Sequence, residues 1–428
     1  MRRLSSVEPE DERAHVPLIK QLGPGLVTGA ADDDPSGIAT YSQAGAQFGY
    51  GLLWSVLFTT PLMIGIQIVS ARIGRVTGHG VAANIRERFP RPVLYAVVSL
   101  LLLANTINIA ADLGAMADAL VLVVGGNSSI YIVFFALLSL TLQIFVPFPR
   151  YAPILKFLTL ALFAYVGTVL VVRTPAEALL QILVPKISWN HDYVAMLVAV
   201  LGTTISPYLF FWQASQEVEE QRATPGHEPL REAPEQARAH FTRIKVDTYV
   251  GMIFSNAIAL CIMLTAAATL HAAGVSHIDS AAQAAEALRP LAGHFAFTLF
   301  AAGIIGTGLL AVPILAGSAA YAVAETFRWP IGLGLTLAEA RGFYLFVSVA
   351  TVVGVAIDLS GMDSIKALVL AAILNGVVSV PIMAILMLLA GNRRVMGAFV
   401  AGRRLKWLGW LATGVMGAAV SVMFALMT

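Results

Sequence analysis

Three consecutive aspartates, Asp32, Asp33 and Asp34, precede Pro35 in the middle of an apolar stretch. Carboxylate oxygens bind hard divalent cations, and a charged side chain at mid-membrane costs about 2.5–3.5 kcal/mol on insertion scales. Proline removes a backbone donor and frees carbonyl groups that need another partner. The pattern therefore predicts a polar break whose carboxylates face water, a polar partner or a cation. We expect Asp34 to act in a site, whereas Asp32 and Asp33 are more easily explained as the cap of a short helix in an aqueous vestibule.

A second apolar stretch is interrupted in the same way at residues 203–208, which read Thr-Thr-Ile-Ser-Pro-Tyr. Unwinding at Pro207 would turn the carbonyls of Thr203 and Ser206 toward a cavity, and hydroxyl and carbonyl oxygens are hard ligands. A Ser-Pro pair alone is usually a simple kink in a membrane helix. Two interrupted segments at corresponding places in two halves of a hydrophobic chain, however, indicate the central binding site of a transporter.

Two further aspartates, Asp112 and Asp118, share a third apolar stretch. Carboxylates within membrane spans are candidates for function, and these two could line one aqueous path. Asp112 is the stronger candidate; the alternative is a buried carboxylate that is only hydrogen-bonded. Asp33 is a further candidate for the same path.

The elements that must hold these residues are membrane spans. Of the 428 residues, 58% are hydrophobic and 12% are charged, and the mean hydropathy is +0.78, which is far too apolar for a soluble globular protein. Windows of roughly 20 apolar residues predict about eleven spans. We expect a transporter and not an enzyme, and the net charge of +2 gives no argument for nucleic acid as a partner. The single cysteine, Cys261, excludes an internal disulfide and a multi-cysteine metal site.

The distribution of basic residues predicts the orientation of the spans. Sorting the 27 lysines and arginines gives 23 on one side of the proposed spans and 4 on the other. We therefore expect a multi-pass protein of the cell membrane with a cytoplasmic N-terminus and an outer C-terminus. Residues 1–15 are too polar to contain a signal-peptide core, so the first span is expected to stay as an anchor.

The positions of the two breaks predict the organisation of the chain. Spans one to five and six to ten each begin with a broken helix, which indicates two five-helix repeats of opposite orientation. The expected parts are a cytoplasmic tail at 1–21, a first repeat at 22–172, a second repeat at 193–390 and an eleventh span at 407–427. Within the second repeat, the polar stretch 219–245 is expected to be a cytoplasmic loop.

These segments resemble the NRAMP family of divalent metal transporters over nearly the whole chain. Residues 34–37 (Asp-Pro-Ser-Gly), after Gly-Pro-Gly at 23–25, resemble the family's first-helix signature Asp-Pro-Gly-Asn. Residues 206–208 (Ser-Pro-Tyr) stand where the sixth helix of the family has Met-Pro-His. Residues 110–114 (Ala-Ala-Asp-Leu-Gly) are similar to the family's Ala-Glu-Val-Ile-Gly, and 271–291 resembles the connection between helices seven and eight.

The resemblance implies an all-α membrane protein with a LeuT-type fold, built from two inverted five-helix repeats and an eleventh transmembrane helix. It also implies metal contacts at four positions, which here are Asp34, Gly37, Thr203 and Ser206. Typical members have an aspartate and an asparagine at the first break, and a methionine and a carbonyl at the second. Only the aspartate and the carbonyl of Thr203 persist here, because Gly37 has no side chain and Ser206 offers oxygen in place of sulfur. Asn375 in the tenth span could complete the site, and an amide that only packs helices is the alternative.

The changed ligands predict a changed ion preference. A thioether helps to select softer transition metals over Mg²⁺ and Ca²⁺, so its loss should relax or reverse that selection. Space at Gly37 also suits Mg²⁺, which dehydrates reluctantly. The pattern is similar to the NRAMP-related magnesium transporter branch, and we expect Mg²⁺ as the favoured cargo and Mn²⁺ as a second one. No cofactor is expected besides this transported cation; the lipid membrane is the other partner, and the sequence indicates no protein partner.

The resemblance also bears on proton coupling. Members with coupled uptake have two histidines on the inner half of the sixth helix, and the matching positions here hold Tyr208 and Gln213. All eight histidines fall in proposed loops or at span ends, so no group with a pKa near 6.5 is expected beside the break. We therefore expect transport without obligatory proton symport. One alternative is a proton-coupled Mn²⁺/Fe²⁺ transporter of the same family. Another is a sodium-coupled amino-acid transporter, but the acidic first break argues against it. The third is a channel or membrane receptor.

Overall fold

The structure is a computed structural model that describes residues 24–146, 150, 159–172, 182–185, 187–361 and 363–427. Across these ranges the chain is helical and contains no β-strand. Nine of the described helical segments are long and apolar enough to cross a membrane by length and composition, and a shorter apolar helix covers Leu160–Val171. The expected tail at 1–21 lies outside the described residues. The prediction of an all-α membrane protein is confirmed.

The helices of the first half alternate long spans with short connecting segments. They are α2 (Pro24–Asp32), α3 (Pro35–Phe48), α4 (Leu53–Thr77), α5 (Val81–Arg88), α6 (Arg91–Val124), α7 (Ser128–Phe145), the 3₁₀ turn η1 (Thr159–Leu162) and α9 (Phe163–Val171). Helices α2 and α3 are the two halves of the broken first span. Each is too short to cross a membrane alone.

The second half begins with another broken span. Its helices are α11 (His191–Thr204), α12 (Pro207–Ala223), α13 (Ala237–Ala266), α14 (Ala281–Glu286), α15 (Arg289–Ala292), α16 (Ala296–Phe327), α17 (Arg341–Asp358), α18 (Ser364–Gly391), α19 (Arg393–Met396) and α20 (Arg403–Ala425). Four short turns join them: η2 (Pro234–Gln236), η3 (Ala267–His271), η4 (Gly293–Phe295) and η5 (Gly397–Phe399). Helices α12 and α13 extend into the expected loop at 219–245 and leave only its middle non-helical.

Proline sets the start of both inner half-helices. Pro35 is the first residue of α3 and Pro207 is the first residue of α12. Proline suits this position because its fixed φ is helical and the first amides of a helix have no partner within the helix. Asp34 and Ser206, which precede the prolines, have extended backbone conformations. The chain therefore unwinds at the two places that the sequence indicated.

Small residues hold the half-helices tightly against whole helices. A Cβ at Gly29 of α2 would lie 2.4 Å from the carbonyl oxygen of Gly251 in α13, and one at Gly202 of α11 would lie 2.1 Å from that of Ala372 in α18. Backbones can approach this closely in a membrane only where side chains are absent. Any larger residue at Gly29 or Gly202 would force the half-helix away from its support.

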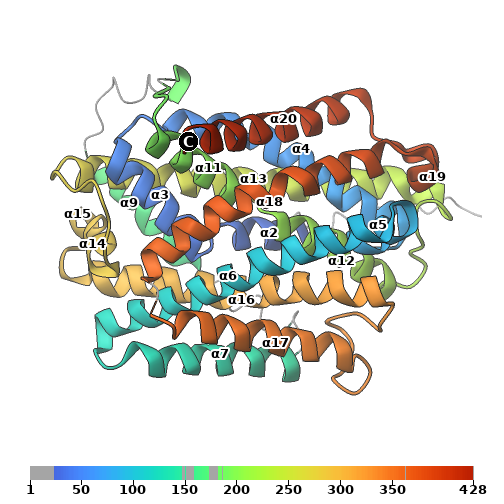
Figure 1. Cartoon of the computed structure of the whole chain (residues 1–428), viewed down its shortest axis with the longest axis horizontal. Coiled ribbons are helices and arrows are strands. Elements are labelled where there is room, and N and C mark those ends of the chain that lie inside the picture. The colour runs from blue at the N-terminus through green and yellow to red at the C-terminus, as the bar shows by residue number, and fades with distance from the viewer. Residues whose placement is uncertain are drawn as a thin grey trace, which may run out of the picture.

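The long helices run side by side across Figure 1, with short segments at both ends of the bundle. Helices α14 and α15 lie at one end together with the C-terminus, and α5 and α19 lie at the other. The broken helices lie inside this bundle: α2 and α3 pack against α13, and α11 packs against α18. The two breaks are thus enclosed by protein, where unwound backbone is tolerated in a membrane.

Candidate cation site at the two helix breaks

The first break is organised around Asp34, which caps α3. Its Oδ1 accepts a hydrogen bond of 2.6 Å from the amide of Gly37, and its Oδ2 accepts one of 3.3 Å from the hydroxyl of Tyr208. Only 2% of the residue is exposed. Capping by aspartate is favourable because the carboxylate satisfies a free amide at the helix start. The same oxygens keep lone pairs that a cation could use.

Asp32 and Asp33 turn toward a different partner, on α13. The Ser255 hydroxyl lies 2.6 Å from Oδ2 of Asp32 and 3.2 Å from Oδ1 of Asp33, so it can donate to either. The other Asp32 oxygen, Oδ1, has no hydrogen-bond partner. Both carboxylates are buried rather than facing an open vestibule. The structure thus separates Asp34, which lies at the break, from its two neighbours, which face α13.

The second break, between α11 and α12, provides hydroxyl and carbonyl oxygens. The Ser206 hydroxyl lies 2.8 Å from the Thr203 carbonyl and 2.9 Å from the Gly202 carbonyl, and it donates back to this last turn of α11. On α18, Ser379 donates a 2.7 Å hydrogen bond to the carbonyl of Ile205. One freed carbonyl of the break is therefore satisfied by a neighbouring helix, as membrane-buried backbone requires. The Ser206 oxygen still has lone pairs free.

The two breaks lie against each other. A Cβ on Gly37 would be 3.2 Å from Oγ1 of Thr203, so position 37 faces the second break directly. The hydroxyl of Tyr41 on α3 is 3.3 Å from that of Thr204 on α11. The hydroxyl of Tyr208, the second residue of α12, lies 2.9 Å from the carbonyl oxygen of Ala31 in α2 and 3.3 Å from Oδ2 of Asp34, so it can donate to either. Side chains and backbone from both broken spans therefore meet at one place.

Asp112 on α6 adds a second carboxylate beside Asp34. It is fully buried, and neither of its oxygens accepts a hydrogen bond of good geometry from the described residues, although the Ser36 amide lies nearby. It is close enough to Asp34 for the two carboxylates to interact electrostatically. In the part of the chain that the structure describes, no lysine or arginine forms an ion pair with Asp34 or Asp112. Two buried carboxylates without a counter-charge favour a bound cation or a proton.

Gln213 and Asn375 make their contacts elsewhere. Gln213 accepts a 2.5 Å hydrogen bond from Gln67 on α4 and lies 3.3 Å from the Thr248 hydroxyl on α13. Asn375 exchanges hydrogen bonds of 2.9 and 3.3 Å with Asn108 on α6. Paired amides of this kind join helices in membranes, so the contacts of Asn375 match the alternative in which it packs helices.

The donor set at the breaks consists of oxygen atoms only. It comprises carboxylate, hydroxyl and carbonyl groups, which suit Mg²⁺, Ca²⁺ and Mn²⁺ better than soft metals. Among the described residues, no group of three or more His, Cys, Asp or Glu side chains is arranged to hold a metal. A cation here would therefore rely on a few carboxylate oxygens, neutral oxygens and its own water.

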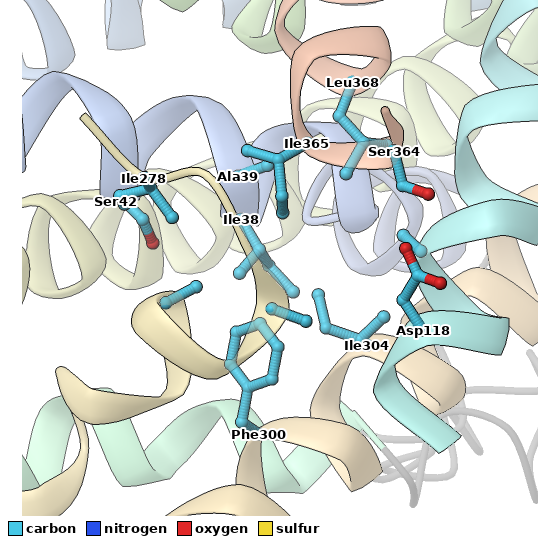
Figure 2. A pocket seen from close by; sticks show the side chains of 13 residues that line it. Ile38, Ala39, Ser42, Asp118, Ile278, Phe300, Ile304, Ser364, Ile365 and Leu368 are labelled. Atoms are coloured by element: carbon cyan, nitrogen blue, oxygen red, sulfur yellow. The ribbon is translucent and has the colours of Figure 1, made fainter. Parts of the chain in front are cut away.

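A narrow pocket, here called the neck, adjoins α3 one helical turn beyond Asp34 (Figure 2). Ile38 on α3 and Leu368 on α18 line it near Asp34, and Phe300 and Ile304 on α16 line it from the other side. Its free volume is about 10 Å³, room for one water molecule at most. Asp118 and Ser364 form its polar edge in Figure 2. Asp118 thus lines the neck, whereas Asp112 lies beside Asp34.

Several residues that complete the candidate site were not predicted from the sequence. Ser255, Ser379 and Tyr41 lie far along the chain from the partners that they contact, and each is an ordinary polar residue in an apolar helix. Their roles follow from helix packing, which places α13 and α18 against the breaks. Only the periodicity of polar residues along these helices could have indicated them.

Comparisons with known proteins agree with this architecture. Residues 25–426 match the Nramp family, described as natural resistance-associated macrophage protein-like. The divalent metal cation transporter MntH of Yersinia enterocolitica is 29% identical over 398 residues, which are 91% of this chain and 91% of that protein. MntH of Pectobacterium carotovorum is 28% identical over 396 residues, 91% of this chain and 90% of that protein.

Solved structures match the fold. The manganese transporter of Eremococcus coleocola, in complex with an aromatic bis-isothiourea compound, superposes with a TM-score of 0.73 at 18% identity. That match covers 98% of this chain and 90% of the other. MHP1, a nucleobase-cation-symport-1 family transporter, gives a TM-score of 0.58 at 14% identity, over 95% of this chain and 92% of the other. The match along nearly the whole sequence, together with a LeuT-type bundle around two broken helices, means that this chain belongs to the Nramp family.

Proposed function

We propose that this protein carries divalent cations across the cell membrane into the cytoplasm, with Mg²⁺ favoured and Mn²⁺ also transported. The observation that carries the proposal is the pair of buried carboxylates, Asp34 at the first break and Asp112 on the uninterrupted helix α6, neither of which pairs with a lysine or arginine among the described residues. Such a pair is costly unless a positive charge neutralises it. Relatives that are named divalent metal cation transporters support the class of cargo.

The preference for Mg²⁺ rests on the chemistry of the second break. Ser206 supplies a hydroxyl, and Gly37 leaves the facing position without a side chain. Mg²⁺ accepts hard oxygen ligands and retains several waters, whereas a softer metal gains little from such a site. Mn²⁺ accepts the same oxygens and is therefore expected as a second cargo.

The proposed motion is alternating access around this fixed site. The half-helices α2 and α12 would move against the whole helices and open the site to one side at a time. Unwound backbone before Pro35 and Pro207 supplies the hinges. The orientation with the N-terminus in the cytoplasm remains part of the proposal, and it rests on the distribution of lysines and arginines.

Uptake into proteoliposomes tests the proposal. The purified protein is expected to take up Mg²⁺ and Mn²⁺ with saturation, and Asp34→Ala is expected to reduce both to the level of empty liposomes. Asp192→Ala, which alters an exposed residue at the start of α11, is the matched control and should retain uptake. Transport of Fe²⁺ or Cd²⁺ without Mg²⁺ would refute the preference. Unitary currents would instead indicate a channel.

A proton-coupled Mn²⁺ transporter is the second candidate. Asp112 favours it, because a buried carboxylate without hydrogen-bond partners could hold a proton while a cation binds nearby. The relative from Eremococcus coleocola is itself named a manganese transporter. Acidification of the liposome lumen that follows cation uptake would support this candidate over the first.

A further inference from the structure

A polar cavity, larger than the neck, lies next to it. Its volume is about 560 Å³, and its walls come from the ends of α6 and α17, the beginnings of α7 and α18, and the segment around α14. Four aspartates line it, namely Asp118, Asp279, Asp358 and Asp363. None of its lining residues in the described part of the chain is basic. The cavity has ample room for a cation with its hydration shell, and a cleft lined by one sign of charge concentrates counter-ions.

Asp358 distinguishes this cavity from an ordinary acidic surface. Only 7% of the residue is exposed, although it ends α17 at the cavity wall. Its Oδ1 packs so closely on Gly114 that a Cβ there would lie 2.3 Å away. Among the described residues, none forms a hydrogen bond or ion pair with the Asp358 carboxylate, and its strongest neighbouring charge is that of Asp118. A buried, unpartnered carboxylate beside another one is unfavourable unless a cation visits it.

The remaining acidic groups lie around the opening. Asp118 accepts a 2.7 Å hydrogen bond from Ser128, which fixes its position. Lys366 lies 3.4 Å from Asp363 and 4.0 Å from Asp279, but 70% of its side chain is exposed. An exposed ion pair of this kind is weak. The four carboxylates therefore outweigh the single nearby lysine.

The cavity adjoins the neck. Asp118, Ser364, Ile365 and Ala281 line both of them. Ile38, which also lines the neck (Figure 2), lies one helical turn after Asp34. In the orientation expected from the distribution of basic residues, this end of the bundle faces the outside of the cell. A cation that enters from outside would meet this cavity before the neck.

We propose that this cavity is an outer capture site for hydrated divalent cations, with the Asp118 and Asp358 carboxylates as its main binding groups. The inference rests on the proposed function for the identity of the cargo, but the site itself is separate from the central one. It holds the cation with its water and raises the local cation concentration at the neck. Asp34 and the second break then bind the ion after it passes the neck.

Direct binding tests the capture site without transport. Mn²⁺ is titrated into purified Asp34→Ala protein and followed by the loss of the free-ion signal in electron paramagnetic resonance. We expect the Asp34→Ala protein to retain weak Mn²⁺ binding. The further substitutions Asp118→Asn and Asp358→Asn, made together, should abolish this binding. The further substitution Asp192→Asn alone should leave it unchanged. Absence of Mn²⁺ binding in the Asp34→Ala protein, or its persistence after both substitutions, would overturn the inference. This readout is independent of whether the wild-type protein transports anything.

Transport kinetics provide the second test. In the otherwise wild-type protein, Asp118→Asn with Asp358→Asn is expected to raise KM about tenfold at low ionic strength, with less effect at high salt, while kcat is retained. Asp118→Glu keeps the charge and should stay near the wild-type KM. An unchanged KM, or a loss of kcat alone, would contradict a capture role. If the wild-type protein transports no divalent cation, the proposed function fails, and the binding test still decides on the site.

Discussion

At the scale of single residues, the proposed function makes the choice of ion depend on a few oxygen atoms. Ser206 and Thr203 share a hydrogen bond at the second break, and Gly37 faces them from the first. Asp34 supplies the charge that any divalent cation needs, so it affects affinity for all of them alike. Discrimination therefore belongs to the neutral positions, where the type of atom and the space for water differ.

Ser206→Met is expected to change the preference at this position. The thioether replaces a hard oxygen with a soft sulfur, so affinity for Mn²⁺ should rise relative to Mg²⁺ by about tenfold. Isothermal titration calorimetry with Mg²⁺, Mn²⁺ and Ca²⁺ measures the change. Ser206→Ala is the matched control and should weaken all three ions without changing their order. A variant Ser206→Met that keeps the wild-type order would show that selectivity lies elsewhere.

At the scale of helices, the two half-helices α2 and α12 are both tied to α13 at the end expected to be cytoplasmic. The amide of Gly25 in α2 donates a 2.6 Å hydrogen bond to Oδ2 of Asp247 in α13. Arg243 of α13 lies 2.5 Å from Glu217 and 2.6 Å from Glu220 of α12. These contacts join the first residues of α2 and the end of α12 to α13, and we expect them to be released if the protein opens toward the cytoplasm.

Asp247→Ala is expected to loosen α2. Loss of a hydrogen bond to a charged group costs about 1.5–3 kcal/mol, so amide exchange in the peptide that covers α2 should accelerate by about tenfold or more. Hydrogen–deuterium exchange with mass spectrometry measures this in detergent or nanodiscs. Exchange in α17, which does not contact Asp247, is the internal reference. Equal acceleration in both helices would mean general destabilisation and not release of this contact.

At the scale of the whole molecule, the membrane potential can supply the energy for uptake. A divalent cation that moves into a compartment at −100 mV gains roughly 4.6 kcal/mol, from about 2.3 kcal/mol per charge. This gain does not require a proton. Tyr208, which has no charge near neutral pH, occupies the position beside Asp34 and donates to it.

Uptake is therefore expected to follow an imposed potential and not a pH gradient. In proteoliposomes loaded with K⁺, valinomycin should accelerate Mg²⁺ uptake, and an inward proton gradient of one pH unit should change it less than twofold if protons are not coupled. A pH dye in the lumen and a Mg²⁺ dye report both ions in one experiment. Strong stimulation by the proton gradient, with lumen acidification, would favour the proton-coupled candidate.

The amino-acid sequence by itself determined the class of protein and the places where the helices break. Long apolar runs require helices in a membrane, and Pro35 and Pro207 cannot continue a helix, so these features follow from local chemistry. Asp34 was predicted as a site residue because a carboxylate inside an apolar run needs a polar partner or a cation. Family membership was also predicted from the short motifs at these breaks, and the match over residues 25–426 confirms it.

Only the tertiary structure decided which polar groups meet. Asp32 and Asp33 turn to Ser255, Asn375 pairs with Asn108, and Asp358 is buried beside Asp118, although nothing in the local sequence indicates these contacts. Each joins residues that are far apart in the chain, on helices brought together by close packing of small residues. Local chemistry sets where a helix starts and ends, whereas the partner of a buried side chain depends on helix packing across the whole bundle.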